Sequence, residues 1–195
     1  MARYLTRGRV HTPSLVITPT EGKIIIKKFL ILSLSDTKRS PDDGLLAAAQ
    51  SGNIESANRY LMRNADIEWR ADDQSTPLYL AVRNGQLKMV KFLVGKHANV
   101  NAKDLPNSMT ILMEAVRVNK PDILQFLLNS DANIDARGYS NRTCLHQCCV
   151  ANYMEMIKMV VEKNPDMNAK DDEGMTPVHL AVQTDPFISK TLKAQ

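Results

Sequence analysis

The sequence is poor in residues that many kinds of functional site require. Its 195 residues include eight glycines and three cysteines, and aromatic side chains make up 5%. It has no Gly-rich loop of the kind that cradles phosphate groups. The three cysteines, clustered between residues 144 and 149, are an odd number in one short segment and give no disulfide framework. Such usage indicates a reducing, intracellular setting, in the cytoplasm or the nucleus.

The chain also lacks the patterns typical of membrane proteins and enzymes. No run of about 18 apolar residues occurs, so we expect no membrane span. There is no Ser/His/Asp order and no pair of carboxylates at a defined spacing, which are common arrangements for nucleophilic and acid–base catalysis. We therefore expect neither catalysis nor a cofactor.

What the sequence does have is a short string that returns at a fixed period. Thr76-Pro-Leu-Tyr-Leu-Ala returns as Thr176-Pro-Val-His-Leu-Ala, and two divergent copies begin at Thr110 and Thr143. The four threonines are 34, 33 and 33 residues apart. A nearly constant period indicates an array of stacked units rather than one closed core. It directs the search for function from a cleft to a surface.

Each copy of the string is followed by the pattern of two short helices. A threonine N-cap with proline at the first helical position, as at Thr76-Pro77, favours a helix start, and Asn84-Gly85 ends that helix in a tight turn. A second helix carries apolar residues at helical spacing. In three successive copies these are Leu87, Val90, Leu93 and Val94; Ile123, Leu124, Leu127 and Leu128; and Met154, Ile157, Val160 and Val161. Neither helix can bury its apolar face alone, so the copies must stack.

The two recurring strings together resemble a known family. Thr-Pro-Leu-His-x-Ala, then a Gly turn, then Ala-Asp-Val-Asn-Ala resembles the ankyrin repeat, and the second string occurs here at Ala98 and Ala132 as Ala-Asn-Val-Asn-Ala and Ala-Asn-Ile-Asp-Ala. The resemblance implies an all-α fold, a solenoid of stacked helix-turn-helix units with β-hairpin fingers. It also implies an earlier copy that begins near Asp43.

We divide the chain into an N-terminal extension, residues 1–42, and a repeat domain, residues 43–195. The predicted units are 43–75, 76–109, 110–142, 143–175 and 176–195. The fifth is incomplete, because Asp185-Pro186 stands where the Gly turn belongs, and it is either a cap or a truncated end. The finger at 103–109 has one extra residue, so it should be longer or bulged.

The extension carries the excess positive charge of the chain. Residues 1–41 have eight Lys or Arg against two acids, whereas residues 42–195 have 17 against 19. An array so close to neutral argues against a phosphate-binding face, so nucleic acid is not the expected partner. We expect the extension to be partly disordered or to cap the exposed apolar end of the stack.

Three other interpretations of the extension stay open. One is that residues 1–41, with their excess of positive charge, bind nucleic acid. Thr12, Thr18 and Ser40 each precede a proline, the minimal pattern for proline-directed phosphorylation. The chain could then be a regulatory or inhibitory subunit that is switched through its basic tail. Residues 1–20, which contain three arginines and no acid, also have the composition of a mitochondrial transit peptide.

Cys144, His146, Cys148 and Cys149 form a cluster of metal-ligand residue types. Residues on a helix advance about 100° each, so His146 lies roughly 200° from Cys144 and the side chains cannot converge on one ion. The repeat register places His146 at the signature histidine and the later cysteines at small buried positions. We predict core residues and no metal site.

The resemblance implies that signature histidines bond the backbone across a repeat boundary. We expect this of His146 and His179. Tyr79 and Met113 replace the histidine in two units, and each should lose that bond. Asn101 and Asn168 stand where asparagines of the family can be hydroxylated.

The resemblance also places partner binding on the face formed by the fingers and first helices. The positions that the fold leaves free are Asp72, Asp73, Ser75, Arg83, Asn84, Asn107, Met109, Arg117, Val118, Tyr139, Arg142, Val150, Asp172, Glu173 and Gln183. Trp69, the single tryptophan, is either an interface anchor or a residue packed under its finger.

Arginines lie between the acidic ends of this face, at positions 83, 117, 137 and 142, which suggests an acidic partner segment across the middle. We predict a monomeric, non-catalytic module or adaptor that binds another protein.

Overall fold

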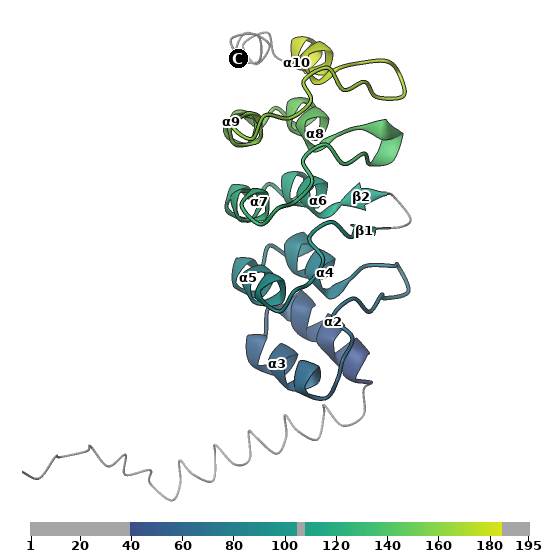
Figure 1. Ribbon diagram of the computed structural model, residues 1–195, viewed down its shortest axis with the longest axis vertical. Coiled ribbons are helices and arrows are strands. Elements are labelled where there is room, and N and C mark those ends of the chain that lie inside the picture. Colours follow the sequence, from purple (N-terminus) through teal and green to yellow (C-terminus); the bar gives the residue numbers. More distant parts are fainter. Residues whose placement is uncertain (1–39, 105–107, 185–195) are drawn as a thin grey trace, which may run out of the picture. The chain divides into compact units, whose positions relative to one another are not determined.

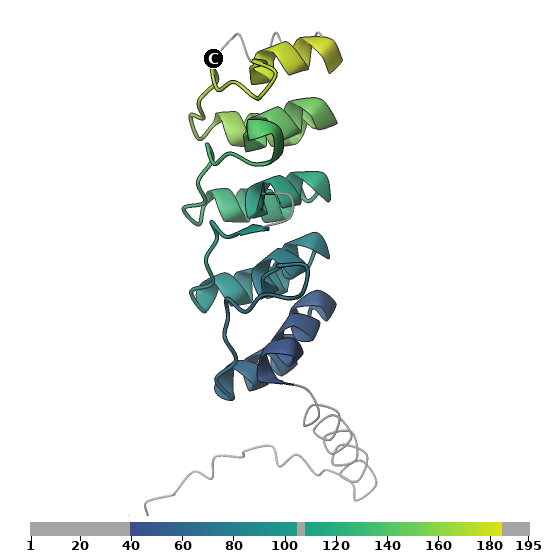
Figure 2. The ribbon, with the colours of Figure 1, turned by 90° about the vertical axis from the view of Figure 1, so that its right-hand side faces the viewer.

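The structure is a computed structural model that describes residues 40–104 and 108–184. Within these ranges α2 to α9 come in pairs, and the pairs and α10 lie in successive layers (Figures 1 and 2). The elements are α2 (Pro41–Ser51), α3 (Ile54–Met62), α4 (Pro77–Arg83), α5 (Leu87–Gly95), β1 (Lys103–Asp104), β2 (Met109–Thr110), α6 (Ile111–Arg117), α7 (Pro121–Leu128), η1 (Tyr139–Asn141), α8 (Cys144–Ala151), α9 (Met154–Val161) and α10 (Pro177–Thr184).

The first helices α2, α4 and α6 begin at a side-chain cap, as the sequence predicts for the threonines. Thr76 and Thr110 each accept a hydrogen bond at 3.2 Å from the backbone N–H three residues later. Ser40 caps α2 in the same way, so this helix begins at Pro41 rather than near Asp43. Ser40 is therefore part of the first repeat. The rest of the predicted extension, with Thr12 and Thr18, lies outside the described residues.

The apolar positions at helical spacing form one buried cluster that runs through every unit from Leu45 to Ala181. Leu93, Leu127 and Val160, all predicted from the second-helix pattern, are completely buried. The first helices α2, α4, α6, α8 and α10 pack in one row, and the second helices α3, α5, α7 and α9 pack in another (Figure 1). Burying each large aliphatic side chain contributes about 1.5–3 kcal/mol to the stability of the fold. Because the buried cluster is shared between adjacent units, each unit is stabilised mainly by its neighbours.

The fingers between units are mostly tight turns rather than β-hairpins. A backbone N–H to carbonyl bond of 2.8–3.0 Å closes three of them, joining Ala71 to Ser75, Gly138 to Arg142 and Asp171 to Met175. The remaining finger, between the second and third units, has a short antiparallel ladder between β1 and β2. The tip of that finger, where we predicted an extra residue, lies outside the described residues.

A row of basic side chains ties each finger to the next. Arg70 donates to the carbonyl of Lys103 at 3.1 Å, Lys103 to that of Arg137 at 2.7 Å, and Arg137 to that of Lys170 at 2.8 Å. The four residues are 33 or 34 apart, so the repeat period itself generates the row. We call these four residues the basic finger row.

A second row of hydrogen bonds crosses the boundaries at the ends of the units. Here side-chain oxygens accept backbone N–H groups of the following unit: Glu68 from Asn99 at 2.7 Å, Asn101 from Asn133 at 2.7 Å, and Asp135 from Asp166 at 2.9 Å. The two rows supplement the apolar core with directional bonds. They set the position of each unit on the one before it, which apolar packing alone does less strictly.

If the basic finger row stabilises the stack, Arg137 and Lys170, which occupy equivalent positions, should contribute differently to the free energy of unfolding. Arg137→Ala removes bonds to the carbonyls of Asn141 and Lys170, at 2.9 and 2.8 Å. We expect the free energy of unfolding in urea to fall by about 1–2 kcal/mol. Lys170→Ala is the matched control, because no acceptor for its ammonium group occurs in residues 40–104 and 108–184. This control should lose less than about 0.5 kcal/mol. Equal losses in the two variants would contradict a structural role for the row.

Candidate protein-binding surface

The structure separates the predicted partner residues by exposure. Trp69, Asp72, Asp73, Arg83, Asn84, Arg117, Tyr139, Val150, Asp172, Glu173 and Gln183 are exposed, and Met109, Val118 and Arg142 are half-buried. The prediction is wrong for Ser75, which is 1% exposed because it turns inward between the finger bond from Ala71 and the buried cap Thr76. Asn107 lies outside the described residues.

Four of the exposed residues line one groove between the first two units. Its lining comes from Asp43, Leu46, Ala47 and Gln50 on α2, from Ala71, Asp72 and Asp73 on the finger, and from Leu80, Arg83 and Asn84 at α4. The groove has a volume of about 600 Å³. We call it the α2–α4 groove. It combines apolar side chains from both helices with acidic side chains from α2 and the finger.

Three other predicted residues share a smaller hollow of about 190 Å³. Met109, Tyr139 and Arg142 line it together with Met113 and Gln147, and we call it the α6–α8 hollow. Tyr139, in the short helix η1, is 72% exposed. Thioether side chains are flexible and polarizable, so this hollow can adapt to an apolar group. Trp69 lines neither the groove nor the hollow, although 42% of it is exposed.

Two arginines of this face are already paired with buried carboxylates. Arg117 donates to both oxygens of Glu114, at 2.7 and 2.6 Å, and the Glu114 side chain is completely buried. These hydrogen bonds raise the pKa of Arg117. Arg142 donates to the equally buried Asp171 at 3.0 Å. The prediction that these two arginines offer free positive charge to an acidic partner is therefore wrong, because each one is paired with a buried carboxylate of the chain.

Glu114 joins two units through a buried hydrogen-bond network that the sequence did not predict. The hydroxyl of Tyr79 donates to its carboxylate at 3.1 Å across a unit boundary. We predicted that Tyr79, which replaces the signature histidine, would lose a bond between units; instead it supplies a different one. The signal that could have revealed this network is the spacing of Glu114 and Arg117, three residues apart on one helix.

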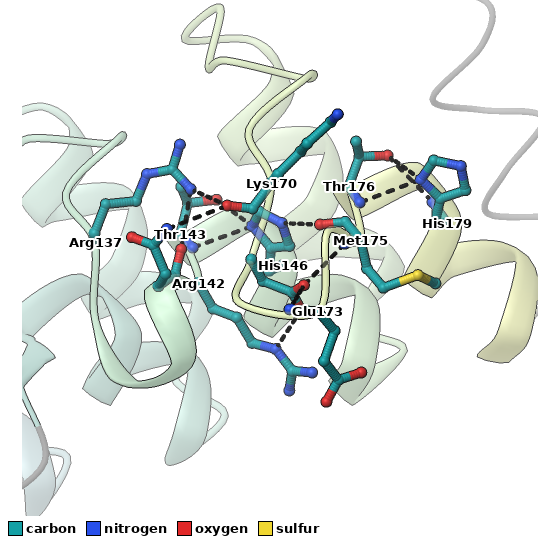
Figure 3. A network of polar contacts seen from close by, with 11 residues as sticks. Arg137, Arg142, Thr143, His146, Lys170, Glu173, Met175, Thr176 and His179 are labelled. Atoms are coloured by element: carbon teal, nitrogen blue, oxygen red, sulfur yellow. Dashed lines mark hydrogen bonds and ion pairs between the residues drawn. The ribbon is translucent and has the colours of Figure 1, made fainter.

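His146 holds the fourth unit to the finger that precedes the fifth (Figure 3). Its Nδ1 accepts the N–H of Thr143 at 3.1 Å, so its Nε2 carries the proton and donates to the carbonyl of Met175 at 3.1 Å. Burial lowers the pKa of His146 against the opposing effect of the Met175 carbonyl. The fold therefore holds the neutral imidazole, in the position predicted for a signature histidine.

The bond predicted for His179 would reach a unit beyond residue 184, outside the described part of the chain, and stays a prediction. The Nδ1 of His179 accepts the N–H of Thr176 at 3.2 Å within its own unit (Figure 3). No carbonyl across a repeat boundary bonds to its ring among residues 40–104 and 108–184, since no described unit follows.

The cysteines near His146 are buried thiols inside the stack. All three are unpaired and buried, and burial raises the pKa of the Cys149 thiol to about 12. In the described part of the chain, no group of three or more His, Cys, Asp or Glu side chains is placed to hold a metal ion. Nor do those residues include a helix with the length and apolar character needed to span a bilayer.

Helix pairs that recur every 33 or 34 residues around a shared core define a repeat solenoid, a class whose partners bind on its surface. The sequence matches the family described as Ankyrin repeats (3 copies) over residues 21–104, 45–138 and 112–193. The chain belongs to the ankyrin-repeat family, whose repeats are a general protein–protein interaction module.

The chain is similar to parts of several larger proteins. It is 31% identical over 134 residues to the ARF GTPase-activating protein Git of Drosophila melanogaster, covering 60% of this chain and 18% of that one. It is 28% identical over 152 residues to human inversin, covering 76% and 14%. A putative ankyrin repeat protein of fowlpox virus is 27% identical over 165 residues, covering 80% and 48%. The chain thus spans less than half the length of each of these relatives.

The buried imidazole predicts that stability depends on pH. Because the pKa of His146 is below its ordinary value of 6.5 in the folded chain, protonation favours unfolding. The free energy of unfolding should have its full value above about pH 6.5 and fall as the pH is lowered from there. Urea unfolding between about pH 5 and pH 7.5 should show a flatter profile for His146→Gln. His179→Gln, which removes an exposed imidazole one unit later, is the matched control. An unchanged slope in His146→Gln would contradict this assignment.

Charge reversal should have a larger effect on stability at an arginine that pairs with a buried carboxylate than at one in an exposed ion pair. Arg117→Glu leaves the buried Glu114 without its cation and adds a carboxylate beside it, so we expect a loss of about 3 kcal/mol or more in the free energy of unfolding. Arg83→Glu disrupts a pair with Asp73 in which both side chains are about half exposed, at 49% and 52%, and should cost less than about 1 kcal/mol. Urea unfolding of both variants tests this. If Arg117→Glu were as stable as Arg83→Glu, the Glu114 network would not be a stabilising feature.

Proposed function

We propose that the chain is a non-catalytic interaction module, or adaptor, that binds a partner protein over the face formed by its fingers and first helices. The observation that carries this proposal is the grouping of solvent-accessible side chains around two depressions. Asp72, Asp73, Arg83 and Asn84 line the α2–α4 groove, while Met109 and Tyr139 line the α6–α8 hollow. Both depressions are formed by fingers and first helices.

The side chains that hold units together differ from those that are exposed on this face, and this difference supports the assignment. The basic finger row, Glu114 and His146 hold units together. Tyr139, by contrast, presents a large aromatic ring with 72% of its area exposed beside two methionines. An exposed aromatic next to an adaptable apolar hollow is the composition that interface anchors favour.

The rigidity of the stack also suits a binding module. Each finger is closed by its own backbone bond and tied to a neighbouring finger by the basic finger row. A surface held in this way loses little conformational freedom when a partner binds, so more of the contact energy appears as affinity. The buried free thiols fit a reducing compartment, and we propose that the module acts inside the cell as a monomer.

The proposal is tested by comparing exposed apolar residues on the two sides of the stack. The full chain is used to capture partners, and the captured proteins are quantified by mass spectrometry. We expect Tyr139→Ala to weaken capture of the specific partner by about tenfold or more, with an unchanged unfolding midpoint. Met62→Ala, in the second-helix row and 75% exposed, is the control and should bind normally. A partner that is lost with Met62→Ala but kept with Tyr139→Ala would place binding on the other side.

A further inference from the structure

The charge of the α2–α4 groove is local and mostly uncompensated. Its lining includes three carboxylates, Asp43, Asp72 and Asp73, against one guanidinium, Arg83, which leaves two negative charges in excess. Arg83 pairs with Asp73 at 3.4 Å. Among the described residues, neither a cation nor a hydrogen-bond donor engages the carboxylate of Asp72, so it faces the groove as a free anion. The array as a whole is nearly neutral, so this excess is a property of the groove.

Hydrogen bonds favour the ionised form of Asp73 in the groove. Burial alone would raise the pKa of Asp73, but bonds from Ser75 and Arg83 lower it overall. The backbone N–H of Ser75 donates to one carboxylate oxygen at 3.1 Å and Arg83 approaches the other. Asp43 accepts a hydrogen bond from the neutral hydroxyl of Ser40 at 2.8 Å.

The apolar lining of the groove fits a long basic side chain better than a small cation. Leu46 is buried, and Ala47, Ala71 and Leu80 are half-buried, and all four line the groove together with the carboxylates. Lysine and arginine pack their methylene stems on such surfaces while the charged end reaches polar groups. Arginine adds a planar fork of donors that matches a carboxylate.

Helices α6 and α8 follow α4 in the same row of first helices (Figure 1). The α6–α8 hollow differs from the groove in chemistry. Its charge is satisfied within the chain, because Arg142 pairs with Asp171, and its other lining residues are two methionines, a tyrosine and a glutamine. Packed helices lie about 8–10 Å apart, so the groove and the hollow, two helix steps apart, are separated by roughly 16–20 Å. An extended chain covers this distance in about five or six residues.

Building on the proposed function, we infer that the partner presents an extended segment with two anchors: a lysine or arginine that enters the α2–α4 groove beside Asp72 and Asp43, and a large apolar side chain, about five or six residues away, that enters the α6–α8 hollow. Charge complementarity selects the first anchor and steers its approach, and apolar burial holds the second.

The test is selection of peptides from a random 12-residue phage library on the immobilised full chain. The expected peptides carry Arg or Lys and, about five or six residues away, Leu, Met, Phe or Trp. A fluorescein-labelled selected peptide is then titrated by fluorescence anisotropy. Asp43→Asn/Asp72→Asn should weaken its binding about tenfold, and should also reduce the loss of affinity when salt is raised.

A matched charge change provides the control. Glu155→Gln/Glu162→Gln removes two negative charges from exposed side chains at α9, in the second-helix row, which lines neither depression, and its affinity should stay within about twofold of wild type. Thermal unfolding of both double variants checks that they fold. Selected peptides without basic residues, or without an apolar residue at the expected spacing, would overturn the two-anchor inference, as would equal losses in the two double variants.

The same experiment separates this inference from the proposed function. If selected peptides lose affinity with Tyr139→Ala but are not basic and ignore the Asp43/Asp72 change, the binding face stands and the two-anchor inference fails. If selected peptides bind equally well to Tyr139→Ala and to both double variants, the binding face itself is wrong.

Discussion

A helix pair of this chain cannot bury its own apolar residues, because its helices are only 7 to 11 residues long. In α6, residues 111–116 are all buried, and this helix packs against α4 and α8 of the two neighbouring units as well as α7 of its own. Every other property of the fold depends on contact with neighbouring units. The buried cluster runs without interruption from Leu45 to Ala181, so no unit has a separate core. Stacking then places residues at equal register beside one another. The basic finger row exists because Arg70, Lys103, Arg137 and Lys170 are brought into line by that register.

Register also decides which charges are available to a partner. Arg117 and Arg142 lie on the finger and first-helix face, yet each neutralises a carboxylate with no exposed surface. Arg83 occupies the position of Arg117 one unit earlier, but its partner Asp73 is half exposed. Similar residues at similar positions therefore stabilise the fold in one unit and remain accessible in another. What differs is whether a carboxylate is present inside the stack.

Much of the fold was predictable because its signals are local. The caps at Thr76 and Thr110 and the buried positions of the second helices depend on spacing within one unit, and the structure has them as expected. Interactions between units were less predictable. The bond from Tyr79 to Glu114 joins residues 35 apart, and no rule within one unit pairs them. Ser75 was misplaced for a similar reason, since its burial depends on how the finger closes. The candidate binding surface was predicted as a list of positions; its division into a groove and a hollow required the three-dimensional stack.

The two rows of hydrogen bonds share an asymmetry. In each bond the earlier unit contributes a side chain, and the later unit contributes only a backbone carbonyl or N–H. Backbone groups are the same in every sequence, so the bonds of these two rows depend only on side chains of the preceding unit. The side chains of the following unit still matter for the apolar core and for the pairs Tyr79–Glu114 and Arg142–Asp171. A change of an exposed side chain on the following unit therefore leaves its bonds in these two rows in place, so exposed positions can diverge without loss of this part of the cohesion of the stack.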